Sequence, residues 1–439
     1  MIKSLVETLT DGLQEGKMIY LPRIFDNILA RRLKAKDAIL VEGAKWCGKT
    51  STAQQQAASA LYLQDPASRD QNLRVAEINP SLLLEGDVPR LIDEWQLAPK
   101  LWDAVRFEAD KRQEFGQFIL TGSTVPPSKG ARRHTGTGRI GRMTMRPMAL
   151  AESGESNAKV SLRSLLAGDP LPMAKSDITL GDLAFLVCRG GWPRSVNASD
   201  TVALQQAFDY LDAIVEDDIS DIDDTPRDPM RARAIMRSYA RMISSQGKIS
   251  QMVADVARSD DPSADATVRS YLSALRRLFV LEELPAWNPN LRSKAAVRTT
   301  DTRHFTDPSI AVAALGANPD GLIADMRTFG LLFESLCIRD LRTYMEALDG
   351  SVSHYRDSTG RECDAVVNLR NGAYGLVEVK LGGEGLIDEG ASNLLDLTKK
   401  IDTETMGEPT FLMVLTGVGD YSYPREDGVL VVPIGTLGA

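Results

Sequence analysis

Eight residues near the N-terminus have the types and spacing of a nucleotide phosphate-binding loop. They read G-x-x-x-x-G-K-T, from Gly43 through Ala44, Lys45, Trp46, Cys47, Gly48 and Lys49 to Thr50. The two glycines let the backbone curl so that successive N–H groups point at phosphate oxygens. Lys49 is placed to reach the β- and γ-phosphates, the Thr50 hydroxyl to ligate Mg²⁺, and Ser51 follows as a further contact. The pattern predicts ATP and Mg²⁺ as ligands; the alternative is a glycine-rich turn that binds nothing.

A short apolar run ending in two acids follows at a distance that suits such a loop. It spans Arg90–Gln96 and has the form of a Walker B segment. In this interpretation Asp93 holds the Mg²⁺ shell and Glu94 polarises the attacking water as general base. The alternative for both acids is the solvated end of an ordinary strand.

Two further groups qualify as partners of the phosphates. Gln117–Ser123 is another apolar run that ends in small polar residues, so Ser123 or Thr121 could sense the γ-phosphate, unless the segment is only a turn. Arg139 and Arg142 follow a stretch rich in Gly, Arg and Thr that predicts a loop. Either arginine could stabilise transition-state charge, in the same chain or across a contact between copies, or could simply be solvated.

The C-terminal part holds a second set of candidate residues. Glu334 lies on a predicted apolar helix, Asp364 on a predicted strand, and Glu378 and Lys380 on one face of the next strand. Such a set could ligate Mg²⁺ through Asp364 and Glu378 and activate water at a phosphodiester.

The register of these strands tests the metal-site hypothesis. A two-residue turn at Asn371-Gly372 would place Asp364 opposite Val379, on the wrong face. The hypothesis therefore requires an odd-length loop or a bulge. The alternatives are a sheet with ordinary surface charges, or a nuclease-like fold without turnover.

The elements that must position these residues follow from local patterns. The apolar run Ala38–Val41 predicts a buried parallel strand before the loop, with a helix after it, and Leu73–Ile78 predicts a second strand. Residues 150–225 read as helical and contain the acidic run Val215–Asp224, which favours a solvated face or linker over metal binding.

A helix-turn-helix followed by an extended pair is predicted between residues 230 and 316. Its second helix, 265–278, carries Arg269, Arg276 and Arg277 opposite an apolar stripe, and Phe279–Leu284 continues as a strand. This is a winged-helix pattern, which can place a basic helix in a DNA groove. The alternative is a winged helix that binds protein.

Composition bounds the class of protein. The chain has 439 residues, a net charge of −9 and 25% charged residues, as in ordinary soluble proteins of about three domains. Its four cysteines form no C-x-x-C pair and its three histidines no metal-ligand spacing. We expect no membrane span and no signal peptide, and a cytoplasmic location.

Taken in order, these motifs resemble a widespread prokaryotic family of AAA-superfamily ATPases with a C-terminal domain related to PD-(D/E)XK nucleases. The resemblance rests on Gly43–Thr50, Leu91–Gln96, Leu120–Ser123, Gly138-Arg139, Gly190-Gly191-Trp192-Pro193, Phe333-Glu334, Tyr355-Arg356-Asp357, Gly360–Asp364 and Glu378-Val379-Lys380. It implies an α/β fold: a P-loop parallel sheet with flanking helices, a winged helix, and a small α/β nuclease-like domain. It favours Arg139 over Arg142, and assigns the nuclease signature to Glu334, Asp364, Glu378 and Lys380.

We therefore expect an N-terminal segment at 1–22, an ATPase core at 23–150, a helical lid or linker at 151–225, a winged helix at 226–316 and a nuclease-like domain at 317–439. The leading hypothesis is an ATP-hydrolysing switch whose nucleotide state controls a DNA-directed module. The alternative is a non-catalytic regulator or toxin–antitoxin-type component. A homo-oligomer is left open.

Overall fold

The phosphate-loop sequence follows the central part of a five-stranded parallel sheet. The strands are β1 (Ala38–Glu42), β2 (Ser59–Tyr62), β3 (Arg90–Asp93), β4 (Phe118–Gly122) and β5 (Ile140–Thr144). Their order is β2-β3-β4-β1-β5, so β4 lies between the phosphate-loop strand and the strand that ends in Asp93. Because all five run parallel, the residues that follow β1, β3 and β4 meet at one edge of the sheet.

The computed structural model describes residues 20–124, 138–223, 225–256, 264–287, 300–356, 360–401 and 406–439. Most of the predicted N-terminal segment and of the loop at 128–138 therefore lies outside the described residues. So do Asp224 and Asp357.

Helices cover both faces of the N-terminal sheet. They are α2 (Ile24–Leu33), α3 (Lys49–Gln54), α4 (Arg69–Ile78) and α5 (Lys100–Arg112), with 3₁₀ turns at Pro80–Leu84 and Trp95–Leu97. Leu40, Phe118 and Leu120 pack with Trp102 on one face, while Ile39 and Ile119 pack with Leu29 on the other. This double coverage explains why β1 and β4 are almost continuously apolar.

The predicted strand at Leu73–Ile78 is wrong, because these residues belong to helix α4. They include good helix formers, and only Ala76 of the helix is buried. The strand that pairs with β3 is instead β2, an edge strand in which only Leu61 is buried, so it carries almost no apolar signal.

The middle of the chain is mainly helical. It contains α6 (Leu150–Ser153), α7 (Leu162–Leu166), α8 (Leu180–Arg189), α9 (Pro193–Val196), α10 (Asp200–Ala213), a π-helix (Ile214–Asp218), α11 (Ile219–Asp221), α12 (Pro229–Ala240), α13 (Ile249–Val256), α14 (Ala264–Arg277), α16 (Pro308–Leu315) and α17 (Pro319–Ala324). A two-residue strand, β6 (Val160–Ser161), pairs with β13 (Leu437–Gly438) at the end of the chain. Three acids of the run at 215–224 make ion pairs: Asp218 with Lys45, Glu216 with Arg233, and Asp223 with Arg227.

The extended pair predicted after α14 is present, although the strand expected at Phe279–Leu284 forms only isolated bridges. Leu284 exchanges two main-chain hydrogen bonds with Thr302, and Leu281 bridges Phe305. The three arginines of α14 face acids of the chain: Arg269 pairs with Asp265, Arg276 with Glu283, and Arg277 with Asp223. The winged-helix interpretation stays a prediction.

The C-terminal domain is a mixed sheet with a helix on each face. Its elements are α18 (Met326–Ala347), β7 (Ser351–Arg356), β8 (Glu362–Asn368), β9 (Tyr374–Lys380), α19 (Glu384–Thr398), β10 (Phe411–Thr416), β11 (Tyr423–Pro424), β12 (Leu430–Pro433) and a 3₁₀ turn (Ile434–Thr436) before β13. The order is β11-β12-β10-β9-β8-β7. Val367 and Val377 pack toward α18, whereas Val366 and Leu376 pack toward α19, as strand alternation requires.

The hairpin between β8 and β9 has the odd-length loop that the metal-site hypothesis needed. Leu369 bonds to Ala373, which leaves the three residues 370–372 as the loop. Ala365 pairs with Val377, so the next position places Asp364 opposite Glu378. The two carboxylates therefore belong to the same face of the sheet.

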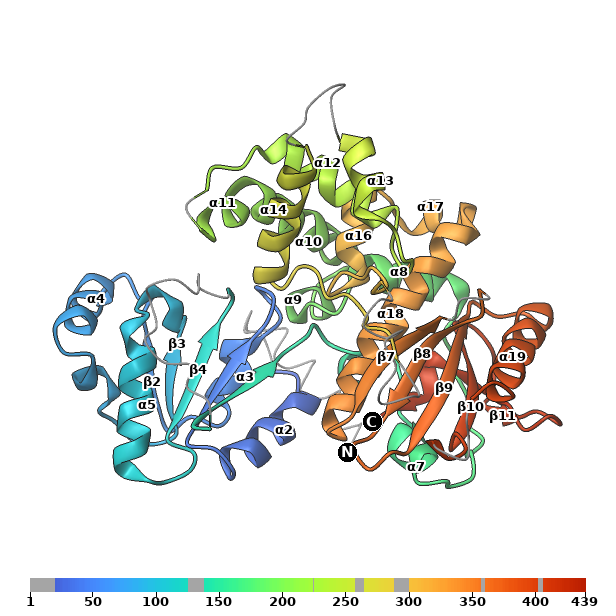
Figure 1. Cartoon of the computed structure of the whole chain (residues 1–439), viewed down its shortest axis with the longest axis horizontal. Coiled ribbons are helices and arrows are strands. Elements are labelled where there is room, and N and C mark those ends of the chain that lie inside the picture. Colours follow the sequence, from blue (N-terminus) through green and yellow to red (C-terminus); the bar gives the residue numbers. More distant parts are fainter. Residues whose placement is uncertain are drawn as a thin grey trace.

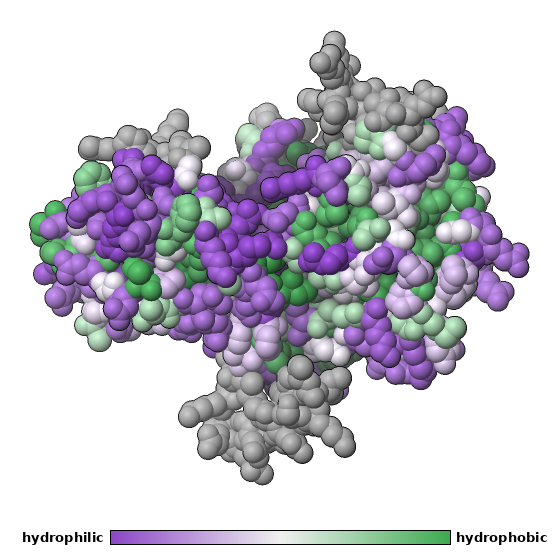
Figure 2. All heavy atoms as spheres, turned by 90° about the horizontal axis from the view of Figure 1, so that it is seen from below, coloured by the Kyte–Doolittle hydropathy of each residue, from purple (hydrophilic) through white to green (hydrophobic). Residues whose placement is uncertain are grey.

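Figure 1 shows how these parts are arranged. The N-terminal sheet and the C-terminal sheet lie on opposite sides, and α18 runs between them. The helices from α8 to α17 lie above, whereas α7 lies below the C-terminal sheet. One hydrophobic cluster extends from Leu29 and Ile39 through the middle helices to Phe333 and Val377. In the view from below in Figure 2, hydrophilic side chains dominate the side of the N-terminal domain, with hydrophobic ones in patches among them. Among the described residues, no helix has the length and apolar character needed to cross a bilayer.

Candidate functional site

The phosphate loop leaves the C-terminal end of β1 and closes on the first turn of α3. Gly43 has φ +153° and passes so close to the neighbouring chain that a Cβ there would lie 2.2 Å from the carbonyl oxygen of Met145. Gly48, at φ +102°, caps α3, so Lys49 and Thr50 are its first residues. The Lys49 Nζ is buried within the loop and donates to the carbonyl oxygens of Gly43 (2.9 Å) and Ala44 (2.8 Å).

Two hydroxyl groups from neighbouring elements donate hydrogen bonds to the Asp93 carboxylate. Its Oδ1 accepts from Thr50 Oγ1 at 2.7 Å and from Thr121 Oγ1 at 2.6 Å. A carboxylate and a hydroxyl are the hard oxygen donors that Mg²⁺ prefers, so the pair Thr50 and Asp93 fits that ion. The sequence predicted that Thr50 and Asp93 both serve the Mg²⁺ ion, and the structure places them in contact. The structure also shows that Thr121 orients the Asp93 carboxylate.

Glu94 lies beside Asp93 and is held by the end of β4. Its backbone is left-handed (φ +55°), its N–H donates to Thr121 Oγ1 at 3.3 Å, and its carboxylate accepts from Ser123 Oγ at 3.0 Å. Gln96 Nε2 also donates to this carboxylate. The role of Gln96 was not predicted, because nothing in the sequence pattern shows that the 3₁₀ turn after Glu94 brings the Gln96 side chain back to the Glu94 carboxylate.

Arg139 does not lie near the phosphate loop of its own chain. It immediately precedes β5, which runs parallel to β1, so it lies at the opposite edge of the sheet from Gly43. Its guanidinium pairs with Asp110 at 2.5 Å and Asp37 at 3.7 Å, and Arg142 pairs with Glu42 at 3.6 Å. Of the two alternatives left open by the sequence, this position does not favour an action of Arg139 on a nucleotide in its own chain; an action across a contact between copies stays a prediction.

The tip of the loop contacts the middle helices. Lys45 Nζ lies 2.5 Å from Asp218 Oδ1, and the half-exposed Trp46 ring lies edge-on to Tyr210 of α10 at 5.3 Å. Tyr210 in turn lies 4.4 Å from the ring of Trp192. From the other side, the buried Arg23 donates to the Cys47 carbonyl oxygen at 2.9 Å. These long-range contacts were not foreseen, and they fix the loop between its own domain and α10.

The C-terminal candidates converge at one cavity. Glu334, Asp364 and Lys380 line a cavity of about 450 Å³, together with Glu362 and residues of the loop at 244–246. Lys380 Nζ lies 3.0 Å from Glu378 Oε2, and Asp364 Oδ2 accepts from the Val379 N–H at 2.7 Å. The four residues predicted from sequence are thus neighbours in space.

These carboxyl groups are crowded and buried. Burial, followed by the charges of Asp364 and Glu378, raises the pKa of Glu334 well above its usual range. Burial and Asp364 raise the pKa of Glu378 to about 8. Glu378 Oε1 is buried and has no hydrogen-bond partner. Yet within the described ranges no three His, Cys, Asp or Glu side chains are arranged as a group that could hold a metal ion.

The raised pKa of Glu378 predicts a pH-dependent stability difference between the wild type and Glu378→Gln. The folded carboxyl keeps a proton that the unfolded chain releases between about pH 4.5 and 8, so wild-type stability is lost as pH rises through that window. The glutamine does not titrate. From pH 5.5 to 8.5, the unfolding free energy of Glu378→Gln relative to wild type should therefore rise by about 1–3 kcal/mol. Urea unfolding at both pH values measures this. Glu426→Gln, which makes the same change at an exposed position outside the cavity, is the control. An unchanged difference would contradict the assignment.

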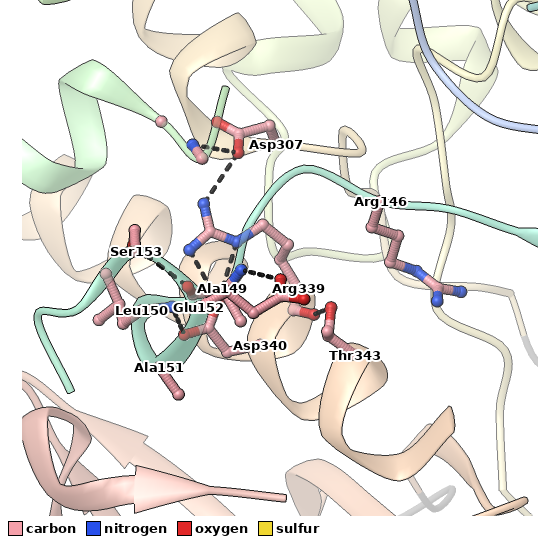
Figure 3. Close-up of polar contacts among 12 residues, drawn as sticks. Arg146, Ala149, Leu150, Ala151, Glu152, Ser153, Asp307, Arg339, Asp340 and Thr343 are labelled. Atoms are coloured by element: carbon pink, nitrogen blue, oxygen red, sulfur yellow. Dashed lines mark hydrogen bonds and ion pairs between the residues drawn. The ribbon is translucent and has the colours of Figure 1, made fainter. Parts of the chain in front are cut away.

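A buried cluster of ion pairs, here called the junction, connects the end of the N-terminal domain to helix α18 of the C-terminal domain. Figure 3 shows Arg339 of α18 between Asp307 and Asp340, at distances of 2.8 Å and 2.7 Å. Asp307 also accepts from the Gly191 N–H, and Asp340 from the Leu150 N–H. A Cβ on Gly191 would lie 2.1 Å from the Met148 carbonyl oxygen, so only glycine fits this approach. The junction therefore joins the end of the N-terminal domain, the Gly190-Gly191 turn and α18.

The match to one family model agrees with this geometry in the N-terminal part. Residues 35–153 match the model of an AAA domain, residues 180–321 a domain of unknown function (DUF8612), and residues 329–437 another (DUF4143). Uncharacterized proteins of Mycobacterium bovis and Mycobacterium tuberculosis are each 23% identical over 410 residues, which is 92% of this chain and 82% of theirs. A Walker-type ATPase of Pyrococcus abyssi superposes with a TM-score of 0.41 and 12% identity, over 66% of this chain and 94% of that one. From the loop geometry and the family match, residues 35–153 are a P-loop ATP-binding domain of the AAA type.

Proposed function

We propose that this chain is a Mg²⁺-dependent ATPase whose nucleotide state controls a nucleic-acid-directed module built from the middle helices and the C-terminal domain. The observation that carries the ATPase part is the cluster at the sheet edge. There Asp93 joins Thr50 to Thr121, and Glu94 is held by Ser123. Thr50 and Asp93 would hold Mg²⁺, Glu94 would take a proton from the attacking water, and Ser123 would orient Glu94.

Phosphate release from ATP tests this function. The wild type should hydrolyse ATP in the presence of Mg²⁺ and not in the presence of EDTA, because the metal ion neutralises the negative charge that develops on the phosphates. Lys49→Ala should lose turnover, whereas Lys111→Ala, a change at an exposed lysine on α5, should keep it. Turnover by Lys49→Ala equal to that of wild type would overturn the assignment.

We also propose that the C-terminal cavity acts on phosphodiesters. Support comes from the pairing of Asp364 with Glu378 across the hairpin, the neighbouring Lys380, and the unpartnered oxygen of Glu378. A divalent cation would neutralise this crowded negative charge, and Lys380 would stabilise an anionic phosphate.

Incubation with plasmid, linear DNA and RNA in the presence of Mg²⁺ or Mn²⁺ tests this activity. Cleavage should be lost in Asp364→Ala and kept in Asp396→Ala, which alters an exposed acid of α19. Equal cleavage by Asp364→Ala and wild type would identify a contaminant. If DNA binds, its affinity should fall with salt at a log–log slope of about −0.9 per neutralised phosphate.

A second candidate function is a nucleotide-dependent regulator that does not cut, such as a toxin–antitoxin-type component. It is favoured by the lack, within the described ranges, of three side chains arranged to hold a metal. The ion pairing of all three arginines on α14 also reduces the positive field expected of a DNA-reading helix. ATP turnover without cleavage of any nucleic acid would select this function.

Helix α18 supports control of the second site by the first. It carries Glu334 at the C-terminal cavity and, about 8 Å further along the axis, Arg339 and Asp340 at the buried junction. The junction reaches Leu150 and Gly191, and Trp192 connects to Tyr210 at the loop tip. A movement of the loop tip could thus reach Glu334 through packed groups.

A further inference from the structure

The C-terminal cavity is built from two parts of the chain that are far apart in sequence. One part carries Glu334, Asp364 and Lys380, together with His354 of β7. The other is the loop at 244–246, which lies between α12 and α13 in the middle of the chain. This loop lies outside residues 329–437, the part that the C-terminal family model matches. The cavity is therefore completed by the middle helices and not by the C-terminal domain alone.

Hydrogen bonds hold the loop at 244–246 against α18. The Ser244 N–H donates to the Arg303 carbonyl oxygen, and the Arg303 N–H donates to the Ser245 carbonyl oxygen, both at 2.8 Å. The Ser244 hydroxyl donates to the Leu331 carbonyl oxygen of α18 at 2.8 Å. Leu331 precedes Glu334 by less than one helical turn. The loop therefore has a fixed position beside the acidic residues of the cavity.

Two polar atoms of cavity-lining residues lack partners. Gln246 Nε2 and His354 Nε2 are both buried, and neither has a hydrogen-bond partner among the described residues. Buried polar groups are almost always paired, because an unpaired one has lost its water and gained nothing. The amide nitrogen is a donor, and the imidazole nitrogen can donate or accept. A ligand in the cavity can therefore supply both missing partners.

His354 lies next to the strand that carries Asp364. Ser353 pairs with Val366 and Tyr355 with Cys363, so the register shifts and His354 faces two residues of β8, of which Asp364 is one. Neighbouring strands are about 4.8 Å apart, and β9 with Lys380 is the strand beyond β8. The cavity thus reaches across about 10 Å from β9 to β7. One nucleotide covers such a span from its phosphate to the edge of its base.

We propose that this cavity takes one unpaired nucleotide of a DNA or RNA strand, with its phosphodiester at Asp364 and its base edge at Gln246 and His354. The inference rests on the proposed action on phosphodiesters and specifies its substrate class. At about 450 Å³ the cavity lies within the range of about 300–1,000 Å³ for small-ligand pockets, which suits one nucleotide and excludes a duplex. Paired bases have their Watson–Crick edges occupied, so only an unpaired base can bond to both side chains.

Fluorescence anisotropy with three labelled oligonucleotides of equal length tests the proposal. They are a single strand, its blunt duplex, and an abasic strand that keeps the phosphates and lacks the bases; the single strand is used as DNA and as RNA. The protein carries Asp364→Asn, which removes the acid so that strands are bound without being cut, and asparagine can still accept from the Val379 N–H. Gln246→Leu is added to remove the base contact. Gln71→Leu makes the same change at an exposed position of α4 and is the control.

We expect the Asp364→Asn protein to bind the single strand about tenfold more tightly than the duplex or the abasic strand, the scale of hydrogen bonds to a base edge. Such a preference with either the DNA or the RNA strand supports the proposal and identifies the sugar. Adding Gln246→Leu should remove most of the preference and leave the abasic affinity unchanged, whereas adding Gln71→Leu should change neither. Circular dichroism verifies that each variant is folded.

The comparison of the single strand with the abasic strand needs no cavity variant, so it decides the matter even if Gln246→Leu does not fold. Equal affinity for these two strands, or tighter binding of the duplex, would overturn the unpaired-nucleotide site. A full base preference in folded Gln246→Leu would place the base elsewhere and also overturn it. Cleavage that Asp364→Ala loses would still support the phosphodiester function in either case. A wild type that neither binds nor cuts any of these strands would refute that function as well.

Discussion

Replacement of Glu94 by glutamine is expected to lower ATP hydrolysis by about 10²–10⁴-fold, the usual contribution of a general base. Glutamine has nearly the same shape, so it can keep its contacts with Ser123 and Gln96, but it cannot accept a proton from water. Because Lys49, Thr50 and the loop amides are unchanged, ATP affinity should stay close to that of wild type.

Single-turnover hydrolysis and equilibrium binding of labelled ATP separate the two effects. Glu85→Gln makes the same chemical change at an exposed position and should retain wild-type turnover. Ser123→Ala, which removes the 3.0 Å contact to the carboxylate and the 3.5 Å contact from Gln96, should give a smaller loss than Glu94→Gln. Wild-type turnover in Glu94→Gln would mean that another group activates the water.

Local order in the chain explains why the ATP site was predictable. The loop's chemistry depends on consecutive residues, and in a parallel sheet the ends of β3 and β4 must meet beside it. Gln96 and Arg23 were not predicted from the sequence. The contact of Gln96 with Glu94 depends on the 3₁₀ turn between them, and the contact of Arg23 depends on the Cys47 carbonyl oxygen, which is distant in sequence. Arg139 does not lie beside the phosphate loop of its own chain, because the direction of β5 places the residues before it at the opposite edge of the sheet.

The C-terminal site was predictable only in part. Strand alternation required an odd-length hairpin loop, and the structure has one of three residues. Alternation fixes which face a carboxylate occupies; it does not fix the side-chain geometry around a metal, and that geometry decides the activity. Likewise Gly190-Gly191 was recognisable as a break, but its close contact with Met148 depends on residues far away in sequence.

Replacement of Arg339 by methionine is expected to cost about 3–5 kcal/mol of stability, because it leaves two buried carboxylates without their cation. Arg339 is 2% exposed, and Asp307 and Asp340 are fully buried. Burial by itself raises the pKa of Asp340, so the guanidinium is what keeps its charge tolerable. An exposed ion pair gives the comparison: Arg31→Met removes one of the two arginine partners of Asp349, the other being Arg32, and should cost less than about 1 kcal/mol.

Urea unfolding of the two variants measures the difference, and a triple variant identifies its cause. If the cost arises from uncompensated charge, adding Asp307→Asn and Asp340→Asn to Arg339→Met should restore part of the lost stability, since asparagine can still accept from the Gly191 and Leu150 N–H groups. If the cost arises from lost packing, the triple variant should be no more stable than Arg339→Met. A loss in Arg339→Met as small as that in Arg31→Met would show that the junction does not hold the N-terminal domain, the Gly190-Gly191 turn and α18 together.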